Sequence, residues 1–469
     1  MTSERGVRST LRLWPGVLAF ACLLVIMGAV FLKSRPGAAR YQIATFTADV
    51  TVPLNHGMMG GKWLSKRVVD PLQANGFVIL GGDAPVVFVS VDWCEIRNDA
   101  YERWQTVLAN AAGTTPDHVM ITTVHQHDAP VADLGAEQLL RERKLSGTIC
   151  DPDFHELAVQ SVASALRESL KSTMPLTHIG TGRAKVEQIA SNRRYTTPDG
   201  HVFFDRTSAT RREAAKKADE GLIDPWLKTL SFWNGDTPVA AVSFYAVHPM
   251  SYYGDGGVSA DFPGIARRAR QTDTPGVRQI YCSGCSGNIT AGKYNDGSRE
   301  NRPVLAKRLQ TALASAWSAT NRHPVGDVRF KSTPLRLEPR NDAGFSPAEL
   351  EEKLTQATPP FDQCLAAMGL HWRRRTDAGH RIQIPMLDFG AVQLLLLPGE
   401  AYVEFQLAAQ AVRPDSFVCV AGYGEAACGY VPTERHIANR DPNLTDWSWV
   451  APGSEPRLLD AIHEALRGN

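Results

Sequence analysis

The sequence lacks several features that mark common classes of function. No long basic run occurs beyond the N-terminus and the formal net charge of the 469 residues is +1, so nucleic-acid binding is not indicated. The Walker phosphate-binding pattern is absent. No serine lies in a G-x-S-x-G elbow, which argues against a serine hydrolase of the α/β type. Repeats and low-complexity tracts are also missing, and 43% apolar residues predict a globular chain with a substantial core.

The cysteines show neither a zinc-finger nor a redox pattern. Cys282 and Cys285 have CxxC spacing, but no second pair or thioredoxin-like context accompanies them, so we interpret them as structural. Of the eight cysteines, Cys22 lies in an apolar segment near the N-terminus. The other seven are an odd number, so in an exported domain at least one stays free or pairs outside the chain.

That apolar segment, residues 13–32, is twenty residues without a charge, long enough to span a bilayer. It is too long for a typical signal peptide and is not followed by a good cleavage site, so we expect an uncleaved signal-anchor. The resulting organisation is a cytoplasmic tail at 1–12, a linker at 33–44 and a folded domain at 45–469. The domain is expected outside the cytoplasm, or secreted if the segment is cleaved.

The rest of the chain alternates between patterns typical of strands and of helices. Asn234-Gly235 between two β-rich runs predicts a hairpin. Other strands are predicted at 85–92, 118–124, 279–282, 382–389, 392–397 and 417–420. Helices are predicted at 99–112, from Pro152, from Asp261, at 301–318, from Ser346 and at 456–467. Because hairpins and helical connections are mixed, we expect an α/β (α+β) fold of mixed β-sheets layered with helices.

Polar side chains follow several of these strands where each strand ends. His125 and His127 come after one strand, His248 after another, and Glu400 after a run of leucines. Residues i and i+2 of a strand share a face, so both imidazoles of the first pair can reach one site, with Asp128 as a partner for a ring N–H. Imidazoles and a carboxylate suit Zn²⁺ and leave a position open for water. This set predicts a metal-assisted hydrolase.

Each of these residues also has a simpler interpretation. An isolated histidine such as His248 is often a satisfied buried residue, and the pair at 125 and 127 could be structural. Glu400 is costly beside a buried strand unless it is paired or metal-bound, but it could instead cap a nearby helix. Tyr430 alone is typical of a core residue.

The order of the motifs resembles the N-terminal catalytic domain of the neutral/alkaline non-lysosomal ceramidases, from about Thr47 to Thr433. The segments that carry the resemblance are FTADVTVPLNHGMMGG (46–61), VVFVSVD (86–92), HQHDAP (125–130), Asn192-Arg193, AVHPMS (246–251) with Asp261 downstream, GCSGNIT (284–290), LPGE (397–400) and GYVPT (429–433).

The resemblance implies a zinc-dependent hydrolase that cleaves an amide or N-acyl bond, as the family cleaves ceramide in sphingolipid metabolism. The implied ligands of one zinc ion are His125, His248, Glu400 and Tyr430. His127 and Arg193 would orient the scissile carbonyl and stabilise developing negative charge. Thr290 falls where the family has a catalytic serine. The expected partners are a small-molecule or lipid substrate and, through the anchor, a membrane.

The chain also departs from the family. Besides Thr290 for serine, Asn288 replaces an aspartate and Pro442 stands where the family has a further tyrosine. The immunoglobulin-like domain that follows in the family is not expected here. Alternatives are a hydrolase of a different ester, amide or glycan on the same scaffold, a TIM-barrel amidohydrolase, or a membrane-tethered binding protein without turnover.

Overall fold

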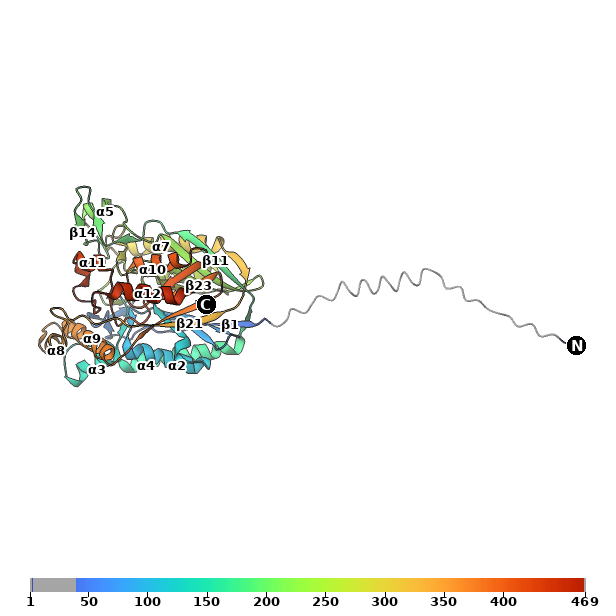
Figure 1. Ribbon diagram of the computed structural model, residues 1–469, viewed down its shortest axis with the longest axis horizontal. Helices are drawn as coiled ribbons and strands as arrows, with labels where there is room; N and C mark the ends of the chain where they lie inside the picture. Colours follow the sequence, from blue (N-terminus) through green and yellow to red (C-terminus); the bar gives the residue numbers. More distant parts are fainter. Residues whose placement is uncertain (1, 3–38, 468–469) are drawn as a thin grey trace. The chain divides into compact units, whose positions relative to one another are not determined.

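The computed structural model describes Thr2 and residues 39–467 (Figure 1). The chain divides into two units, Met1–Ala39 and Arg40–Asn469. The expected tail, the anchor at 13–32 and the first part of the linker lie outside the described residues. Within the described part, none of the helices combines the length and the apolar character needed to cross a membrane.

Three β-sheets form the framework of the larger unit. The first has the order β10-β1-β5-β6-β8, with strands Met174–Leu176, Tyr41–Asp49, Gln73–Leu80, Val86–Val91 and Val119–Thr123. The second has the order β18-β16-β15-β11-β20, with strands Arg278–Ser283, Thr237–Tyr245, Trp226–Asn234, His178–Lys185 and Asn321–Pro324. The third has the order β21-β22-β23-β25, with strands Arg329–Leu335, Ile382–Asp388, Val392–Leu396 and Phe417–Ala421.

Each sheet is antiparallel except for one pair at its edge. The parallel pairs are β6 with β8, β16 with β18, and β23 with β25. The carboxyl ends of two parallel strands meet at the same edge of a sheet, which is where α/β proteins commonly place ligands. All the predicted metal ligands lie in segments that follow these pairs.

Short two-stranded ladders complete the β-structure. They are β2 (Gly57–Met58) with β3 (Trp63–Leu64), β4 (Arg67–Val68) with β17 (Gly257–Val258), β7 (Glu95–Ile96) with β9 (Val131–Ala132), β12 (Ser191–Asn192) with β19 (Ile289–Thr290), β13 (Tyr195–Thr196) with β14 (Val202–Phe203), and β24 (Glu400–Ala401) with β26 (Tyr430–Val431).

Helices cover the outer faces of the sheets (Figure 1). The helices that contact the first sheet are α2 (Asn98–Ala112) and α4 (Pro152–Ser169), and α3 (Leu134–Glu142), α9 (Pro360–Asp377) and α8 (Pro347–Gln356) pack in sequence beside α2. Those near the other two sheets are α6 (Asp261–Asp273), α7 (Asn301–Ser318), α10 (Val403–Val412) and α12 (Ser454–Leu466). The short helices are α5 (Glu213–Lys217), α11 (Glu434–Ala438), η1 (Pro116–His118), η2 (Leu170–Ser172) and η3 (Pro442–Leu444).

Side chains along a strand point alternately to the two faces of its sheet, and this explains how the sheets and helices pack. Phe77 and Phe88 join a core that includes side chains from all three sheets, whereas Val78, Val87 and Val89 face a second core shared with helices. Successive residues of a strand point to opposite faces, so a strand with apolar residues on both sides must be covered twice. The predicted mixed sheets layered with helices are therefore confirmed.

Most predicted elements are present, and two points differ. The first strand begins at Tyr41, inside the range given to the linker, because Tyr41 and Ile43 are buried and pair with β5 and β10. The strand predicted at 118–124 spans Val119–Thr123, and His125 lies in the loop that follows it.

Candidate metal centre

His125 occupies a strained turn rather than a strand. Its φ of +69° lies in the left-handed region, which few residues other than glycine adopt without cost. Backbone bonds hold the turn, with Val124 N donating to Val91 O at 2.9 Å and His125 N to Trp93 O at 2.9 Å. The prediction that His125 and His127 share a strand face is wrong, yet the turn still brings their ring centroids to 5.4 Å.

Three buried side chains from separate segments converge on one point. His125 Nε2 lies 3.1 Å from His248 Nε2 and 3.2 Å from Glu400 Oε2, and His248 Nε2 lies 3.1 Å from the same oxygen. The three residues are at most 2% exposed. The structure therefore brings these three candidate ligands together in one cluster.

Backbone carbonyls fix which ring nitrogens carry hydrogen. His125 Nδ1 donates to Cys94 O at 2.9 Å, and His248 Nδ1 donates to Ser286 O at 2.8 Å. A carbonyl can only accept, so both Nδ1 atoms are protonated and both Nε2 atoms can present lone pairs to the cluster. The expectation that Asp128 holds a ring N–H is wrong, because its carboxylate accepts from Gly254 N.

The cluster has the donor set and spacing of a metal site. Glu400 Oε2 is buried without a hydrogen-bond partner, which costs free energy unless a cation compensates it. Ligand atoms at Zn–N distances of 2.0–2.1 Å around a tetrahedral ion lie about 3.3 Å apart, close to the distances found here. The residues present therefore fit a bound metal ion.

Electrostatics couples the three groups. Burial alone would raise the pKa of Glu400, but His125 and His248 outweigh it and lower that pKa. Burial lowers the pKa of His125, but Glu400 and Cys94 together outweigh it and raise that pKa well above the ordinary value. Burial and the charge of Arg193 lower the pKa of His248 to about 4, so it stays neutral as a ligand must.

Tyr430 and Arg193 flank the cluster. Glu400 and Tyr430 are direct partners in the parallel ladder of β24 and β26, so both enter the site from neighbouring strands. Arg193 Nη1 donates to Tyr430 Oη at 2.9 Å and to Asn443 Oδ1 at 3.0 Å, whereas Arg193 Nε is buried without a partner. A cavity of about 260 Å³ is lined by Arg193, Tyr430, His125, His127 and Glu400, among others.

His127 is held by rings rather than by hydrogen bonds. Its Nδ1 is buried without a partner, and its ring lies edge-on to Tyr253 at 4.8 Å and to His248 at 5.7 Å. Burial and the two neighbouring histidines lower its pKa well below the ordinary value, so it is a neutral imidazole at physiological pH. It can accept or donate one proton within the cavity.

Thr290 lies apart from this cavity and does not line it. Its hydroxyl donates to Thr207 O at 2.8 Å and accepts from Gly292 N at 3.0 Å, so it is engaged with backbone. Asn288 is also structural in its contacts, since its amide bridges Val403 N and Glu404. The catalytic role of Thr290 stays a prediction, and the geometry gives it no support.

Two residues that the sequence did not single out contact the ligands directly. Tyr423 stacks on His125 at 4.2 Å, and its hydroxyl bonds Ser286 Oγ at 2.7 Å. Tyr423 follows a parallel strand and has a φ of +54°, so its position after β25 was the available signal. Cys94 also lines the cavity, and all seven described cysteines are buried and free.

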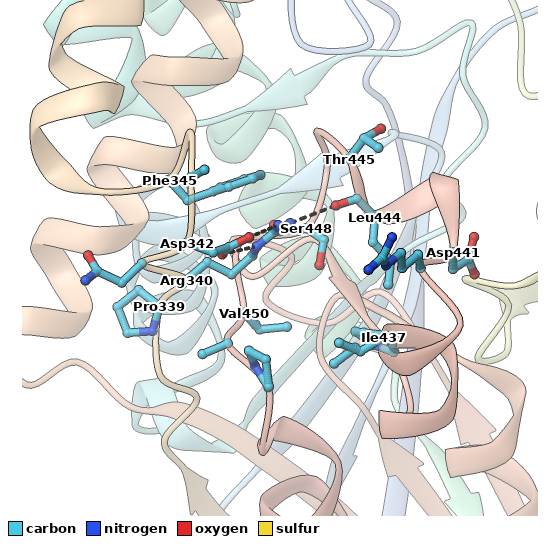
Figure 2. Close-up of a pocket in the computed structure, with 16 residues that line it drawn as sticks. Pro339, Arg340, Asp342, Phe345, Ile437, Asp441, Leu444, Thr445, Ser448 and Val450 are labelled. Carbon is cyan, nitrogen blue, oxygen red and sulfur yellow. Dashed lines mark hydrogen bonds and ion pairs between the residues drawn. The ribbon is translucent and has the colours of Figure 1, made fainter.

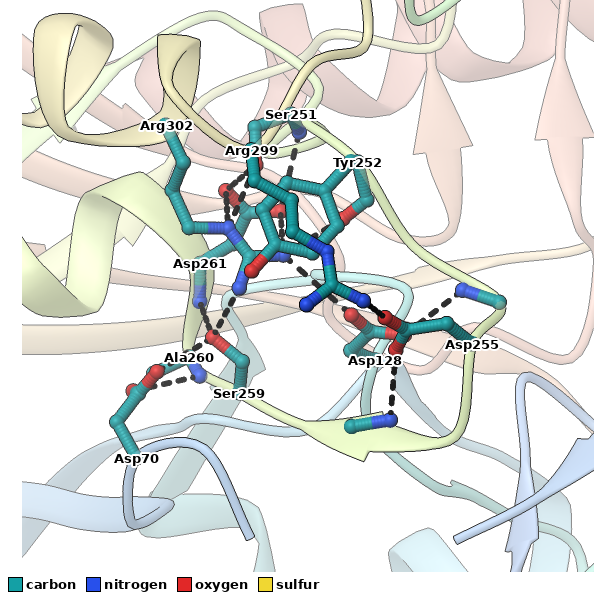
Figure 3. A network of polar contacts seen from close by, with 12 residues as sticks. Asp70, Asp128, Ser251, Tyr252, Asp255, Ser259, Ala260, Asp261, Arg299 and Arg302 are labelled. Carbon is teal, nitrogen blue, oxygen red and sulfur yellow. Dashed lines mark hydrogen bonds and ion pairs between the residues drawn. The ribbon is translucent and has the colours of Figure 1, made fainter. Parts of the chain in front are cut away.

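A buried ionic network fixes the loop that follows His248 (Figure 3). Arg302 of α7 bonds Ser251 Oγ at 2.7 Å, Ser259 Oγ at 3.0 Å and Tyr252 O at 2.6 Å. It also lies within 3.4 Å of Asp128 and Asp261. Because Asp128 follows His127 directly, this single arginine ties together the loops that carry both histidines.

Comparison with known proteins bears on the fold. No protein-family model matches the chain, and no curated protein sequence matches it significantly. Among the solved structures that match it, two do so at a TM-score of 0.67 and 18% identity. The neutral ceramidase from Pseudomonas aeruginosa aligns over 92% of this chain and 76% of its own, and a ceramidase complexed with C2 over 91% and 75%. The fold suggested by the motifs is therefore confirmed.

Proposed function

From a fold shared with the neutral ceramidases, we propose that this chain is a zinc-dependent hydrolase that cleaves an amide or N-acyl bond. The observation that carries the proposal is the convergence of His125, His248 and Glu400 with an unpartnered carboxylate oxygen. Tyr430, the partner of Glu400 on the next strand, is the proposed fourth ligand. The ceramidase neighbours point to a lipid substrate.

The chain's own residues provide the remaining functions. Zn²⁺ held here would polarise a carbonyl and lower the pKa of bound water to roughly 7. Arg193 has a charged, buried guanidinium whose Nε has no protein partner, so it can stabilise negative charge that develops on the substrate oxygen. His127 is a neutral imidazole that lines the same cavity, so its ring N–H can orient the scissile carbonyl and stabilise developing negative charge beside Arg193.

The proposal is tested by hydrolysis of a short-chain N-acyl amine by the zinc-loaded protein. We expect turnover that a chelator abolishes and added zinc restores. A His248→Ala variant should show none, whereas a His323→Ala variant, altered at an exposed histidine on β20, should match the parent protein. Zinc-loaded protein without turnover on N-acyl, ester or glycan substrates would favour the binding-protein alternative.

We also propose that residues 13–32 anchor the domain at a membrane, outside the cytoplasm. The support is the length and lack of charge of this segment. Protease added to intact cells should remove the domain, and alkaline washing should leave it with the membrane. A domain that stays protected in intact cells would refute the proposed location.

A further inference from the structure

An apolar cavity lies beside the metal cavity. It measures about 690 Å³ and is lined mostly by aliphatic, proline and phenylalanine side chains (Figure 2). The lining residues that matter here are Phe345, Ile437, Leu444, Val450 and Ala451. We call it the apolar cavity.

A single segment, Asp441 to Ser448, which we call the strap, separates the two cavities. On one side Asn443 bonds Arg193 at 3.0 Å, and Trp447 Nε1 donates to Glu95 Oε1 at 2.9 Å. On the other side Leu444 and Ser448 line the apolar cavity. Thr445 is exposed and lines both cavities, so the two cavities adjoin at this residue.

An arginine holds the strap from the apolar side (Figure 2). Arg340 Nη1 donates to Leu444 O at 2.7 Å and to Ser448 O at 3.2 Å. Its guanidinium lies 3.6 Å above the ring of Phe345 and is paired with Asp342. Both the charge and the hydrogen bonds of Arg340 are thus engaged, and the cavity that it borders offers a ligand mainly apolar surface.

The two cavities differ in what they can hold. The metal cavity is small and is bordered by histidine, arginine, glutamate, asparagine and lysine side chains, which suits a polar head with a scissile bond. The apolar cavity has more than twice the volume, 690 Å³ against 260 Å³, and suits an alkyl chain. An amphiphile with its head at the metal would reach the apolar cavity by crossing Thr445.

We propose that the apolar cavity is the binding site for one alkyl chain of the substrate. This inference rests on the proposed hydrolase function and adds to it a location for the chain. In this arrangement the substrate passes from the metal cavity to the apolar cavity at Thr445. The strap then lies between the polar head of the substrate and its alkyl chain. The chain is bound by burial of its methylene groups and not by charge.

The experiment introduces a bulky side chain at positions on the edge of the apolar cavity. Ala451 is half-buried and Ala343 is exposed, and both line the cavity, so a tryptophan at either position adds bulk without removing a core side chain. Ala438 is exposed on α11 and does not line the cavity, which makes Ala438→Trp the matched control. Hydrolysis of N-dodecanoyl and N-acetyl amides of the same amine is compared in all four proteins.

We expect Ala451→Trp and Ala343→Trp to lower kcat/KM for the dodecanoyl amide by at least about tenfold. The acetyl amide should be hydrolysed at the parental rate, and Ala438→Trp should change neither value. Loss of both activities together, or no change in either, would overturn the inference. Phe361 lines the metal cavity itself. If Phe361→Ala lost activity only on the dodecanoyl amide while both tryptophan variants kept the parental activity, the alkyl chain would lie in the metal cavity and the inference would be overturned.

A binding measurement separates this inference from the proposed chemistry. Dodecanoate and acetate are titrated calorimetrically into the zinc-loaded chain and its variants. Dodecanoate should bind at least about tenfold more weakly to Ala451→Trp than to the Ala438→Trp control, with acetate unaffected. If this difference in binding were found in a protein without turnover, the proposed hydrolase function would be refuted and the alkyl-chain site would still be supported. Equal dodecanoate binding to both variants would refute the chain site, whatever the turnover.

Discussion

Two clusters of histidine and carboxylate differ in how their polar atoms are satisfied. In one, Asp133 accepts from Asn98 Nδ2 at 2.8 Å and is paired with His371 Nδ1 at 2.6 Å and Arg97 Nε at 3.3 Å. In the other, Glu400 Oε2 has no hydrogen-bond partner, although the Nε2 atoms of two histidines lie beside it. Both clusters contain the residue types that bind metals.

The difference shows that residue types alone do not mark a metal site. The protein itself neutralises Asp133, with an arginine, a histidine and an amide, so an ion there would have to displace existing bonds. Around Glu400 the ring N–H groups are turned away toward backbone carbonyls, which leaves three atoms with lone pairs directed at one another. A proton on His125 Nε2 satisfies that nitrogen and Glu400 Oε2, but only a metal cation satisfies all three atoms together.

Among the variants that test the difference between the two clusters, Arg193→Ala is expected to cause the largest loss of turnover. Arg193 is the cation next to the unsatisfied cluster, and removing one such donor should lower kcat by about 10²–10³-fold. Zinc content should stay at the parental level, because Arg193 is not a ligand. Near-normal turnover of the zinc-loaded variant would refute the role of Arg193. Arg194→Ala, its sequence neighbour, is the control and should retain full activity.

A smaller effect is expected from Asn443→Ala. The amide of Asn443 bridges Arg193 and Asp441, whose carboxylate also accepts from Tyr402 Oη at 2.9 Å. Losing one hydrogen bond to a charged group should lower kcat/KM about tenfold and leave zinc bound. Asn443→Gln, which keeps an amide, should recover part of the activity. Equal losses in both variants would indicate that only the fold of the strap matters.

The raised pKa of His125 predicts that zinc affinity depends on pH. Glu400 and Cys94 together raise this pKa in spite of burial, so the metal-free protein holds a proton on His125 at neutral pH that zinc must displace. Affinity should rise about tenfold per pH unit up to that pKa. In the metal-free protein, the raised pKa of His125 also adds to the free energy of unfolding. This contribution is complete at pH values below the pKa of His125 in the unfolded chain, and it is lost as the pH rises through the pKa of His125 in the folded chain.

Competition with a chelator of known affinity at several pH values measures this slope, and denaturant unfolding of the metal-free protein measures the stability. A zinc affinity that does not change between about pH 6 and 8 would contradict the account, because no proton would then be displaced.

A substitution in the cluster around Asp133, whose polar atoms are already hydrogen-bonded, is expected to have the smallest effect on the metal centre. His371→Ala removes one partner of Asp133 and should lower the free energy of unfolding by about 1–3 kcal/mol. Zinc content and turnover should not change, because the cluster at Asp133 binds no metal in this account. Loss of a second equivalent of zinc in this variant would show that the distinction between the clusters is wrong.

Particular residues show what could be predicted from the sequence. Polar residues directly after apolar strands indicated His125, His248 and Glu400, and parallel pairing at the edges of the sheets explains why this pattern works. The turn at His125 could not be predicted, since a positive φ on histidine is imposed by backbone contacts from distant segments. Tyr423 was missed because a buried tyrosine looks like any other core residue.

The position of Thr290 could not be predicted either. Alignment by motif placed it at a catalytic serine, whereas its hydroxyl bonds backbone away from the cavity. Short motifs fix the order of residues but not the direction of a side chain, which depends on the segment that packs against it. The strap was equally hidden, because its two faces are defined by Arg193 and Arg340, about 150 residues apart.

The most direct test is the metal content of the fragment Arg40–Asn469, measured by elemental analysis beside a His125→Ala/His248→Ala double variant. We predict one zinc ion per chain in the parent fragment and none in a folded double variant. A parent fragment without metal after loading with zinc, or a double variant that keeps its zinc, would contradict the account.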